Sequence, residues 1–295
     1  MRLWVWRHFR FELPDDWEML QFSKDLSRGR CAFADRYQFR IEFDWKTVPG
    51  PPDFKRLLSD YRSNLEREGK LENARFETVV GWNGLMGRCG GGETSRFGRF
   101  FPEEGCLVEM VFIWPGNREP PVERPVLDSF ARCGPDAGGG QRWRAFGVDI
   151  RAPAAWRLTD CRVEPALADL RFAAPKPPFC LRCRRLGMVN AWLTVPVARW
   201  LGTQVPDAVK SPAAAAAQVS GHHVDTVHGR FVPRGILKRK GEYGAVAWIC
   251  PSDHRLYVVE SVAAGEGEPS ATRFPEAWQA DRGPLACCAA MGESE

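Results

Sequence analysis

The feature that most constrains the fold of this chain of 295 residues is an internal repeat. Two tryptophans, one proline and one phenylalanine recur at a single offset of 139 positions. The matched pairs are Trp4 and Trp143, Pro14 and Pro153, Trp17 and Trp156, and Phe33 and Phe172. Because tryptophan and proline are uncommon residues, four matches in one register indicate that an ancestral unit was duplicated.

A second block of matches lies near the end of each half. An aromatic strand ends at Pro102 or Pro251, a short polar turn follows, and an apolar strand begins at Leu107 or Leu256. This order is typical of a β-hairpin. The offset has grown to 149, which indicates an insertion between the two blocks. We assign the insertion to the alanine tract 213–217, as a loop or an extra helical turn.

Helical spacing is clearest over residues 53–68, where apolar side chains recur every three or four positions. Asp53 is suited to cap this helix, and Gly69 to end it. Shorter helices are expected at 122–131, 195–204 and 270–280. Runs of strands interrupted by a few helices favour an antiparallel sheet with helices packed on it.

We therefore predict an α+β fold with two tandem domains, each an antiparallel β-sheet packed against a few helices. The first domain covers residues 1–133, a Gly/Pro linker covers 134–141, and a diverged second copy covers 142–282. Residues 283–295 have little apolar surface to bury, so a disordered tail is expected. Each half is long enough to form a core without metals or disulfides.

The order of these elements resembles the PsbP-like family. This group includes the photosystem II protein PsbP, a small Ran-binding nuclear import factor, and the bacterial DcrB proteins with their secretion-effector chaperones. The resemblance is carried by the first strand with Pro14 and Trp17, the helix, the late hairpin, and Ser129-Phe130 in the closing helix. It covers residues 9–131 and, more weakly, 146–280, where Ala277-Trp278 replaces the Ser-Phe pair. The resemblance implies a binding or chaperone module without shared catalytic residues.

The charge distribution is uneven along the chain. The net charge of +4 is too small to direct the protein onto nucleic acid, which is therefore not an expected partner. Residues 1–140 hold 21 basic and 22 acidic side chains, whereas residues 141–295 hold 20 and 15. Two basic runs carry the excess, and they are either solvated strand edges or a binding site. Their candidate binding residues are Arg182, Arg184, Arg185, Lys238, Arg239 and Lys240.

The N-terminus offers a second candidate interface. Trp4 and Trp6 alternate along a short strand and lie beside Arg7. Tryptophan and arginine are enriched among the residues that dominate binding energy at protein interfaces. These three residues are candidates for a partner contact, and packing as an edge strand is the alternative.

The search for chemistry finds no catalytic constellation and no cofactor motif. The glycine runs lack the residues of a phosphate-binding loop. Cys180 and Cys183 have the spacing of half a zinc site, which His222 and His223, with the nearby His228, would have to complete. Because residues three apart on a strand point to opposite faces, structural cysteines are the favoured interpretation.

Targeting signals are also missing. The ten cysteines are scattered through apolar runs, the N-terminus lacks a signal-peptide core, and no apolar run approaches the ~18 residues of a transmembrane helix. We expect a cytoplasmic protein with free thiols and no transmembrane segment.

Together these patterns favour a non-enzymatic protein- or peptide-binding module, as a chaperone, adaptor or scaffold subunit of a larger assembly. A sheet face or a groove between the copies would accept an apolar segment. The alternative is a ligand- or metal-binding protein, or an enzyme, with its site between the two domains. Nucleic-acid binding by the basic second half is a third, weaker hypothesis, which a steep salt dependence would support. The sequence does not indicate an oligomeric state.

Overall fold

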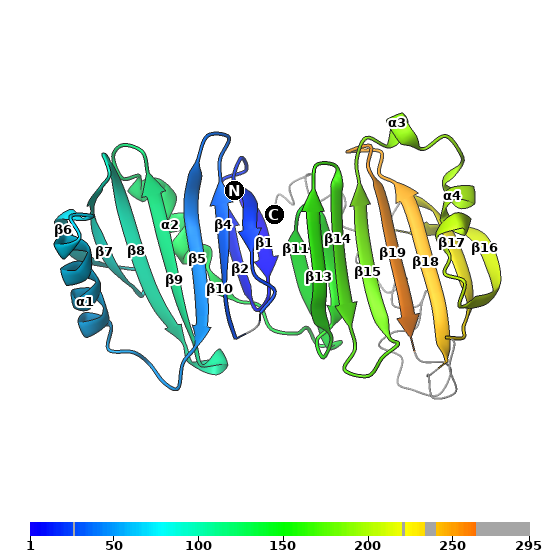
Figure 1. Cartoon of the computed structure of the whole chain (residues 1–295), viewed down its shortest axis with the longest axis horizontal. Coiled ribbons are helices and arrows are strands. Elements are labelled where there is room, and N and C mark those ends of the chain that lie inside the picture. The colour runs from blue at the N-terminus through cyan, green and yellow to red at the C-terminus, as the bar shows by residue number, and fades with distance from the viewer. Residues whose placement is uncertain (26, 220–221, 234–239, 264–295) are drawn as a thin grey trace. The chain divides into compact units, whose positions relative to one another are not determined.

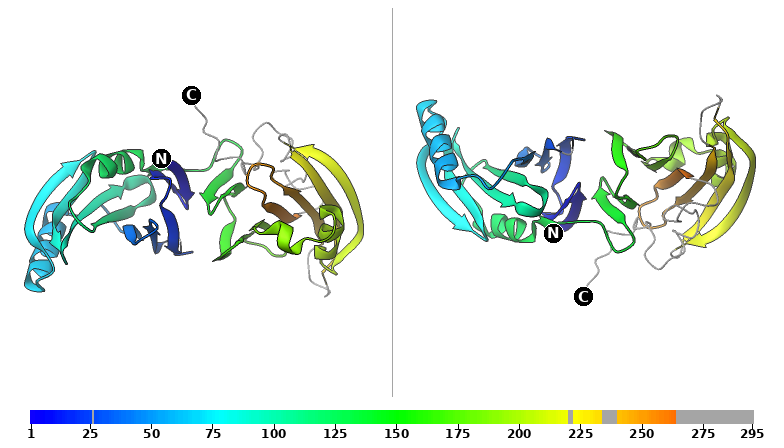
Figure 2. Two further views of the ribbon diagram at one scale, coloured as in Figure 1. Left: turned by 90° about the horizontal axis from the view of Figure 1, so that it is seen from above. Right: turned by 90° about the horizontal axis from the view of Figure 1, so that it is seen from below.

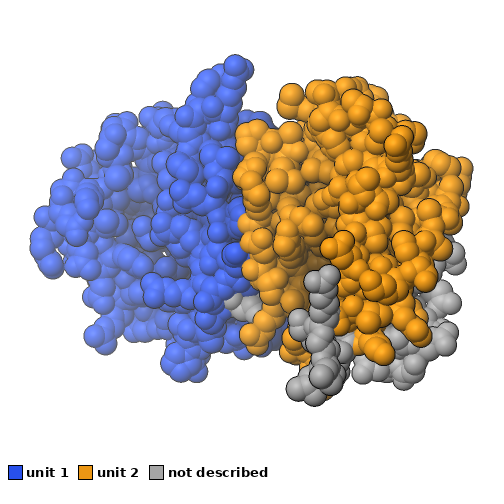
Figure 3. All heavy atoms as spheres, turned by 45° about the vertical axis from the view of Figure 1, so that its right-hand side comes forward, with its two compact units in different colours: residues 1–132 blue, residues 133–295 orange. Residues whose placement is uncertain are grey.

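A computed structural model describes residues 1–25, 27–219, 222–233 and 240–263. The chain divides into two compact units, Met1–Arg132 (unit 1) and Cys133–Glu295 (unit 2) (Figure 3). Each unit is described by itself below.

The main sheet of unit 1 has seven antiparallel strands in the order β3-β4-β5-β9-β8-β7-β6 (Figure 1). These strands are β3 (Glu18–Phe22), β4 (Arg28–Ala34), β5 (Phe39–Thr47), β6 (Glu72–Val79), β7 (Trp82–Cys89), β8 (Gly92–Phe101) and β9 (Cys106–Trp114). A smaller group pairs β1 (Arg2–Trp6) with β2 (Phe9–Leu13), and β2 with β10 (Ala131–Arg132). The helices are α1 (Phe54–Arg67), the 3-10 turn η1 (Pro102–Glu104) and α2 (Pro120–Ser129).

The core of unit 1 is aromatic. Phe9 and Phe11 alternate along β2 and face the main sheet, as the period of a strand requires. The ring of Phe130, which follows α2, lies 5.1 to 5.5 Å from those of Phe9, Phe11, Phe43 and Trp82. Large rings of this kind supply most of the apolar area that such a small unit can bury.

The two long helices of unit 1 pack on opposite faces of its main sheet (Figure 2). Leu58 of α1 packs against Leu71 and Leu85, whereas the Trp82 indole donates to the Leu127 carbonyl of α2. Residues 82 and 85 of one strand point in opposite directions, so α1 covers the outer face and α2 the core face.

Unit 2 repeats this strand order. Its main sheet runs β13-β14-β15-β19-β18-β17-β16, and a hairpin of β11 and β12 corresponds to β1 and β2. The strands are β11 (Gly140–Ala145), β12 (Val148–Pro153), β13 (Arg157–Glu164), β14 (Leu167–Ala173), β15 (Cys180–Leu186), β16 (Val209–Val219), β17 (His222–Phe231), β18 (Gly241–Ile249) and β19 (Leu256–Ala263). The helices are α3 (Val189–Trp192) and α4 (Val197–Gln204).

The residues matched in the sequence lie at equivalent places in the two units. Trp4 of β1 meets Phe33 of β4 edge-on at 5.0 Å, and Trp143 of β11 meets Phe172 of β14 edge-on at 5.2 Å. The hairpin turns correspond as well, because Arg7 and its counterpart Phe146 both have a positive φ, 64° and 55°. Shared topology, packing and turn geometry are what an internal duplication predicts.

The predicted α+β class is wrong, because the protein is mostly β. Among the described residues, 55% lie in strands and 15% in helices. The alanine tract 213–217, expected as a loop or helical turn, instead forms the middle of β16 and pairs with β17. Pairing with β17 overrides the helix propensity of alanine here. The helix expected at 270–280 and the tail 283–295 lie outside the described residues.

Several local predictions are confirmed. The Asp53 side chain caps α1 by accepting from the Arg56 amide, and α2 occupies the second predicted helix. α4 lies within the third predicted helix, 195–204, and the predicted late hairpins are β8–β9 and β18–β19.

In the segment predicted as a linker, 134–141, Asp136 accepts from the amides of Gly138 and Gly140, where β11 begins. Within the described residues, no helix combines the length and hydropathy needed to cross a bilayer.

Candidate functional site

The aromatic interface predicted at the N-terminus is not exposed. Trp4, Trp6 and Arg7 have exposed fractions of 2%, 0% and 3%. Trp6 packs edge-on against Phe22 at 5.4 Å, and the Arg7 guanidinium lies 5.7 Å from the Trp45 ring. These side chains belong to the interior because β1 presents them to the rings of the main sheet, so the predicted contact surface is corrected to a core.

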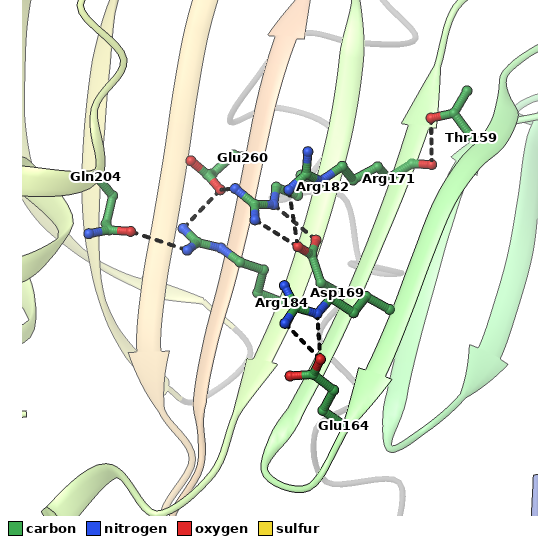
Figure 4. A network of polar contacts seen from close by, with 9 residues as sticks. Thr159, Glu164, Asp169, Arg171, Arg182, Arg184, Gln204 and Glu260 are labelled. Atoms are coloured by element: carbon green, nitrogen blue, oxygen red, sulfur yellow. Dashed lines mark hydrogen bonds and ion pairs between the residues drawn. The ribbon is translucent and has the colours of Figure 1, made fainter. Parts of the chain in front are cut away.

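The basic run of unit 2 divides between the two faces of β15. Arg182 and Arg184 point to the face that α4 covers, where Arg184 donates to Gln204 (Figure 4). Arg185 points to the opposite face, as strand alternation requires. Arg185 donates to the Tyr257 hydroxyl at 3.1 Å and to the Phe146 carbonyl at 3.2 Å. The three arginines therefore do not form one patch.

Carboxylates on neighbouring strands compensate the arginines on the α4 side. Arg182 donates twice to Asp169 of β14, at 2.9 and 2.7 Å, and Arg184 lies 2.9 Å from Glu260 of β19. Burial raises the pKa of Asp169, but the hydrogen bonds and charges of Arg182 and Arg171 outweigh it and hold that pKa below its ordinary value. Arg182 and Arg184 thus belong to an ion-pair network within unit 2.

The remaining basic and metal candidates are not brought together. Lys238 and Arg239 lie outside the described residues, and Lys240 is exposed. Cys180 and Cys183 point to opposite faces of β15, and burial raises the pKa of Cys183 to about 12. His222 and His223 lie on β17, which β19 and β18 separate from β15. Within the described part of the chain, no three metal-ligating side chains form a cluster.

A polar cavity of about 350 Å³ lies at one end of unit 1. Arg7, His8, Trp45, Glu104 and Cys106 are among its lining residues. Burial lowers the pKa of His8 and raises that of Cys106, so the imidazole and the thiol are both uncharged at neutral pH. This pair lacks the thiolate that a nucleophilic cysteine requires.

The corresponding place in unit 2 is filled. Gly147 is the counterpart of His8, and a Cβ added to it would lie 2.6 Å from the Arg185 guanidinium carbon. Arg185 also lies 3.6 Å from Asp253, the counterpart of Glu104. Arg185 therefore occupies the region of unit 2 that corresponds to the cavity beside Trp45 in unit 1.

A second cavity of unit 1, about 440 Å³, lies between α1 and the strands β6 and β7. We call it the α1–β6 groove. Phe54, Leu58 and Ser59 line it from α1, Phe76 and Thr78 from β6, and Asn83 from β7. The side chain of Phe76 is unusually open for its size, with 51% of the residue exposed. Its exposure leaves an aromatic ring available at the mouth of the groove.

The α1–β6 groove lies beside one edge of the main sheet of unit 1. β6 is the last strand and pairs only with β7 among the described residues. Phe54 packs over Gly98 of β8, where an added Cβ would approach the ring to 2.9 Å, so glycine lets α1 lie close to the sheet at this end. None of these residues is a candidate site residue from the sequence patterns described above. The alternation of Ala74, Phe76 and Thr78 is the signal that indicates a strand there.

No protein-family model matches this chain, and no curated protein is similar enough to it in sequence to count as a relative.

Proposed function

We propose that the protein is a non-enzymatic module that binds an extended protein or peptide segment in the α1–β6 groove. The observation that carries this proposal is the position of an apolar groove beside an edge strand, with Phe76 half exposed between them. The bound segment would serve a chaperone, adaptor or scaffold role.

If the bound segment adds to the sheet as a further strand beside β6, it uses both the edge strand and the apolar groove. The outer backbone groups of β6 would pair with those of the incoming segment, and these hydrogen bonds depend little on sequence. Because side chains alternate along a strand, every second residue of the segment would point towards α1. An apolar residue there would contact Phe54, Leu58 and Phe76.

The aromatic contact would supply much of the affinity. A fully buried phenylalanine removes roughly 150–250 Å² from water, and about half of that area is still exposed at Phe76. At about 25 cal/mol per Å², covering it contributes roughly 2 kcal/mol, which corresponds to more than a tenfold change in affinity.

A charge at the rim would favour one orientation of the bound segment. Lys55 on α1 lines the groove. Glu77 also contributes to the lining, but its carboxylate points to the opposite face of β6 from Phe76 and pairs with Arg118, whose guanidinium lies 2.7 Å away. A segment with an acidic residue near Lys55 would therefore be favoured.

The test is a selection of random unstructured peptides on the immobilised full chain, followed by affinity measurements with Phe76→Glu. We expect enriched peptides with alternating apolar residues, a loss of affinity of tenfold or more in F76E, and slower hydrogen exchange in β6 when peptide is bound. Leu20→Glu is the matched control, because Leu20 lies on the opposite edge strand and is 59% exposed. Absence of enrichment, or equal binding by F76E and the parent protein, would contradict the proposal.

The cytoplasm is the compartment that we propose for this activity. Cys106 and Cys183 are free thiols, and both are buried. Free buried cysteines of this kind are compatible with a reducing environment.

A further inference from the structure

Strand β16 is an edge strand of unit 2 that lacks the usual protection of such edges. It ends the main sheet and pairs only with β17 among the described residues (Figure 1). Residues 211–218 are exposed. Natural edge strands are normally blunted by charged side chains, by proline or by a bulge, because their free backbone groups invite another strand.

The side chains of β16 leave this edge open. Residues 213–217 are five consecutive alanines, and no charged residue lies between Lys210 and the end of the strand. A bulge at Ser211, which has a φ of 51°, and Pro212 protect only the beginning of the strand. Over residues 213–217 the backbone groups are flanked by methyl groups alone.

The equivalent strand of unit 1 shows the contrast. β6 occupies the same place in the strand order and carries Glu72, Arg75 and Glu77 along its length. Its charges restrict which strands can pair beside it, and its groove provides a side-chain pocket. The alanine tract 213–217 of β16 has neither charges nor bulky side chains, so it can pair closely with a strand that is equally small.

We propose that β16 pairs antiparallel with β16 of a second copy of this chain, about a two-fold axis near Ala215. The pairing joins two seven-stranded sheets into one and goes beyond the proposed peptide-binding function. The second copy is the favoured occupant because the tract is self-complementary: alanine meets alanine on both faces, without repulsion and without a pocket that would select a foreign sequence. Two-fold dimers with such isologous contacts are the commonest oligomers.

The expected dimer is reversible. One strand from each copy buries less than the roughly 1,200 Å² of a standard stable interface, so the equilibrium depends on protein concentration. Sedimentation of the full chain from roughly 1 to 500 µM, a range that covers weak affinities, measures it directly. We expect the mass to rise from monomer to dimer, and the β16 amides to exchange more slowly at the high concentration.

Lysine substitutions test the contact. Ala215→Lys and Ala214→Lys place charges on opposite faces of β16, and like charges across a two-fold axis repel. We expect each variant to remain monomeric over the whole range, while the conservative Ala215→Ser still dimerises. Leu20→Lys is the control on an edge strand of unit 1, and circular dichroism checks that all variants fold.

Three results would overturn the proposal. The first is a parent protein that stays monomeric at the highest concentration. The second is a dimer that persists in both lysine variants. Slow exchange in β16 that is independent of concentration would show that another part of the same chain covers the edge. Failure of the peptide proposal is separable, because Phe76→Glu leaves β16 intact and A215K leaves the α1–β6 groove intact.

Discussion

At the scale of single residues, many charged groups of this protein form ion pairs within and between its secondary-structure elements. Glu123 of α2 is 1% exposed, yet it accepts from the Trp114 indole at 2.8 Å and from Arg118 at 2.6 Å. Arg118 also binds Glu77 at the rim of the α1–β6 groove. A buried carboxylate of this kind is tolerated only because its oxygens are fully occupied by donors.

We expect Glu123→Gln to lower the free energy of unfolding of unit 1 by about 3 kcal/mol, because it removes one charge of a buried pair and leaves Arg118 with the more exposed Glu77 as its remaining carboxylate. Glu66→Gln provides a matched control. Its i,i+4 pair with Arg62 on α1 is 39% to 43% exposed, and its loss should cost about 0.5 kcal/mol or less. Urea unfolding with hydrogen exchange of the α2 and β9 amides measures both changes. A cost for E123Q no larger than that for E66Q would contradict this account.

At the scale of elements, prediction from the sequence succeeds where the signal is local. The N-cap Asp53 and the apolar spacing of 54–67 lie within α1 itself, so the helix was predicted correctly. The alanine tract of β16 was not, because its partner β17 decides its conformation. The basic run at 182–185 can be interpreted from the sequence only as solvated strand edges or as a binding site, for the same reason: the carboxylate of Glu260 lies 78 positions away in the sequence and reaches Arg182 only through sheet pairing. The α1–β6 groove could not be predicted either, because its lining residues come from three separate elements, α1, β6 and β7.

The cap of α1 permits a direct test at this scale. The Asp53 carboxylate accepts from the Arg56 amide at 3.0 Å, and Asp53→Ala leaves that donor without its protein acceptor. We expect a loss of about 1 kcal/mol in stability and faster exchange in the first turn of α1. Asp60→Ala is the control, since Asp60 is exposed and its contact with Arg56 is 3.9 Å long. Equal effects of the two substitutions would show that the cap contributes nothing specific.

At the scale of the whole molecule, the two units share one topology and differ in the charged side chains on their strands. Arg30 of β4 and Asp169 of β14 occupy positions related by the repeat offset, yet they carry opposite charges. Arg30 binds Asp44 of β5, whereas Asp169 binds Arg182 of β15. The repeat was predictable because tryptophan and proline positions persist. The divergence was not, because an ion pair is equally compatible with the fold in either polarity.

This equivalence predicts that the polarity of unit 2 can be reversed. Asp169→Arg alone would place a further guanidinium beside those of Arg171 on the same strand and of Arg182 and Arg184 on β15. We expect it to destabilise unit 2 by about 3 kcal/mol. Asp169→Arg combined with Arg182→Asp restores a pair of the polarity that unit 1 already uses, and should recover at least half of that loss. Hydrogen exchange of β14 and β15 in the four members of this double-mutant cycle measures the coupling. Additive losses would mean that the network depends on Glu260 and its other partners rather than on the pair of Asp169 and Arg182. They would also remove the ground for treating the two polarities of this ion pair as equivalent.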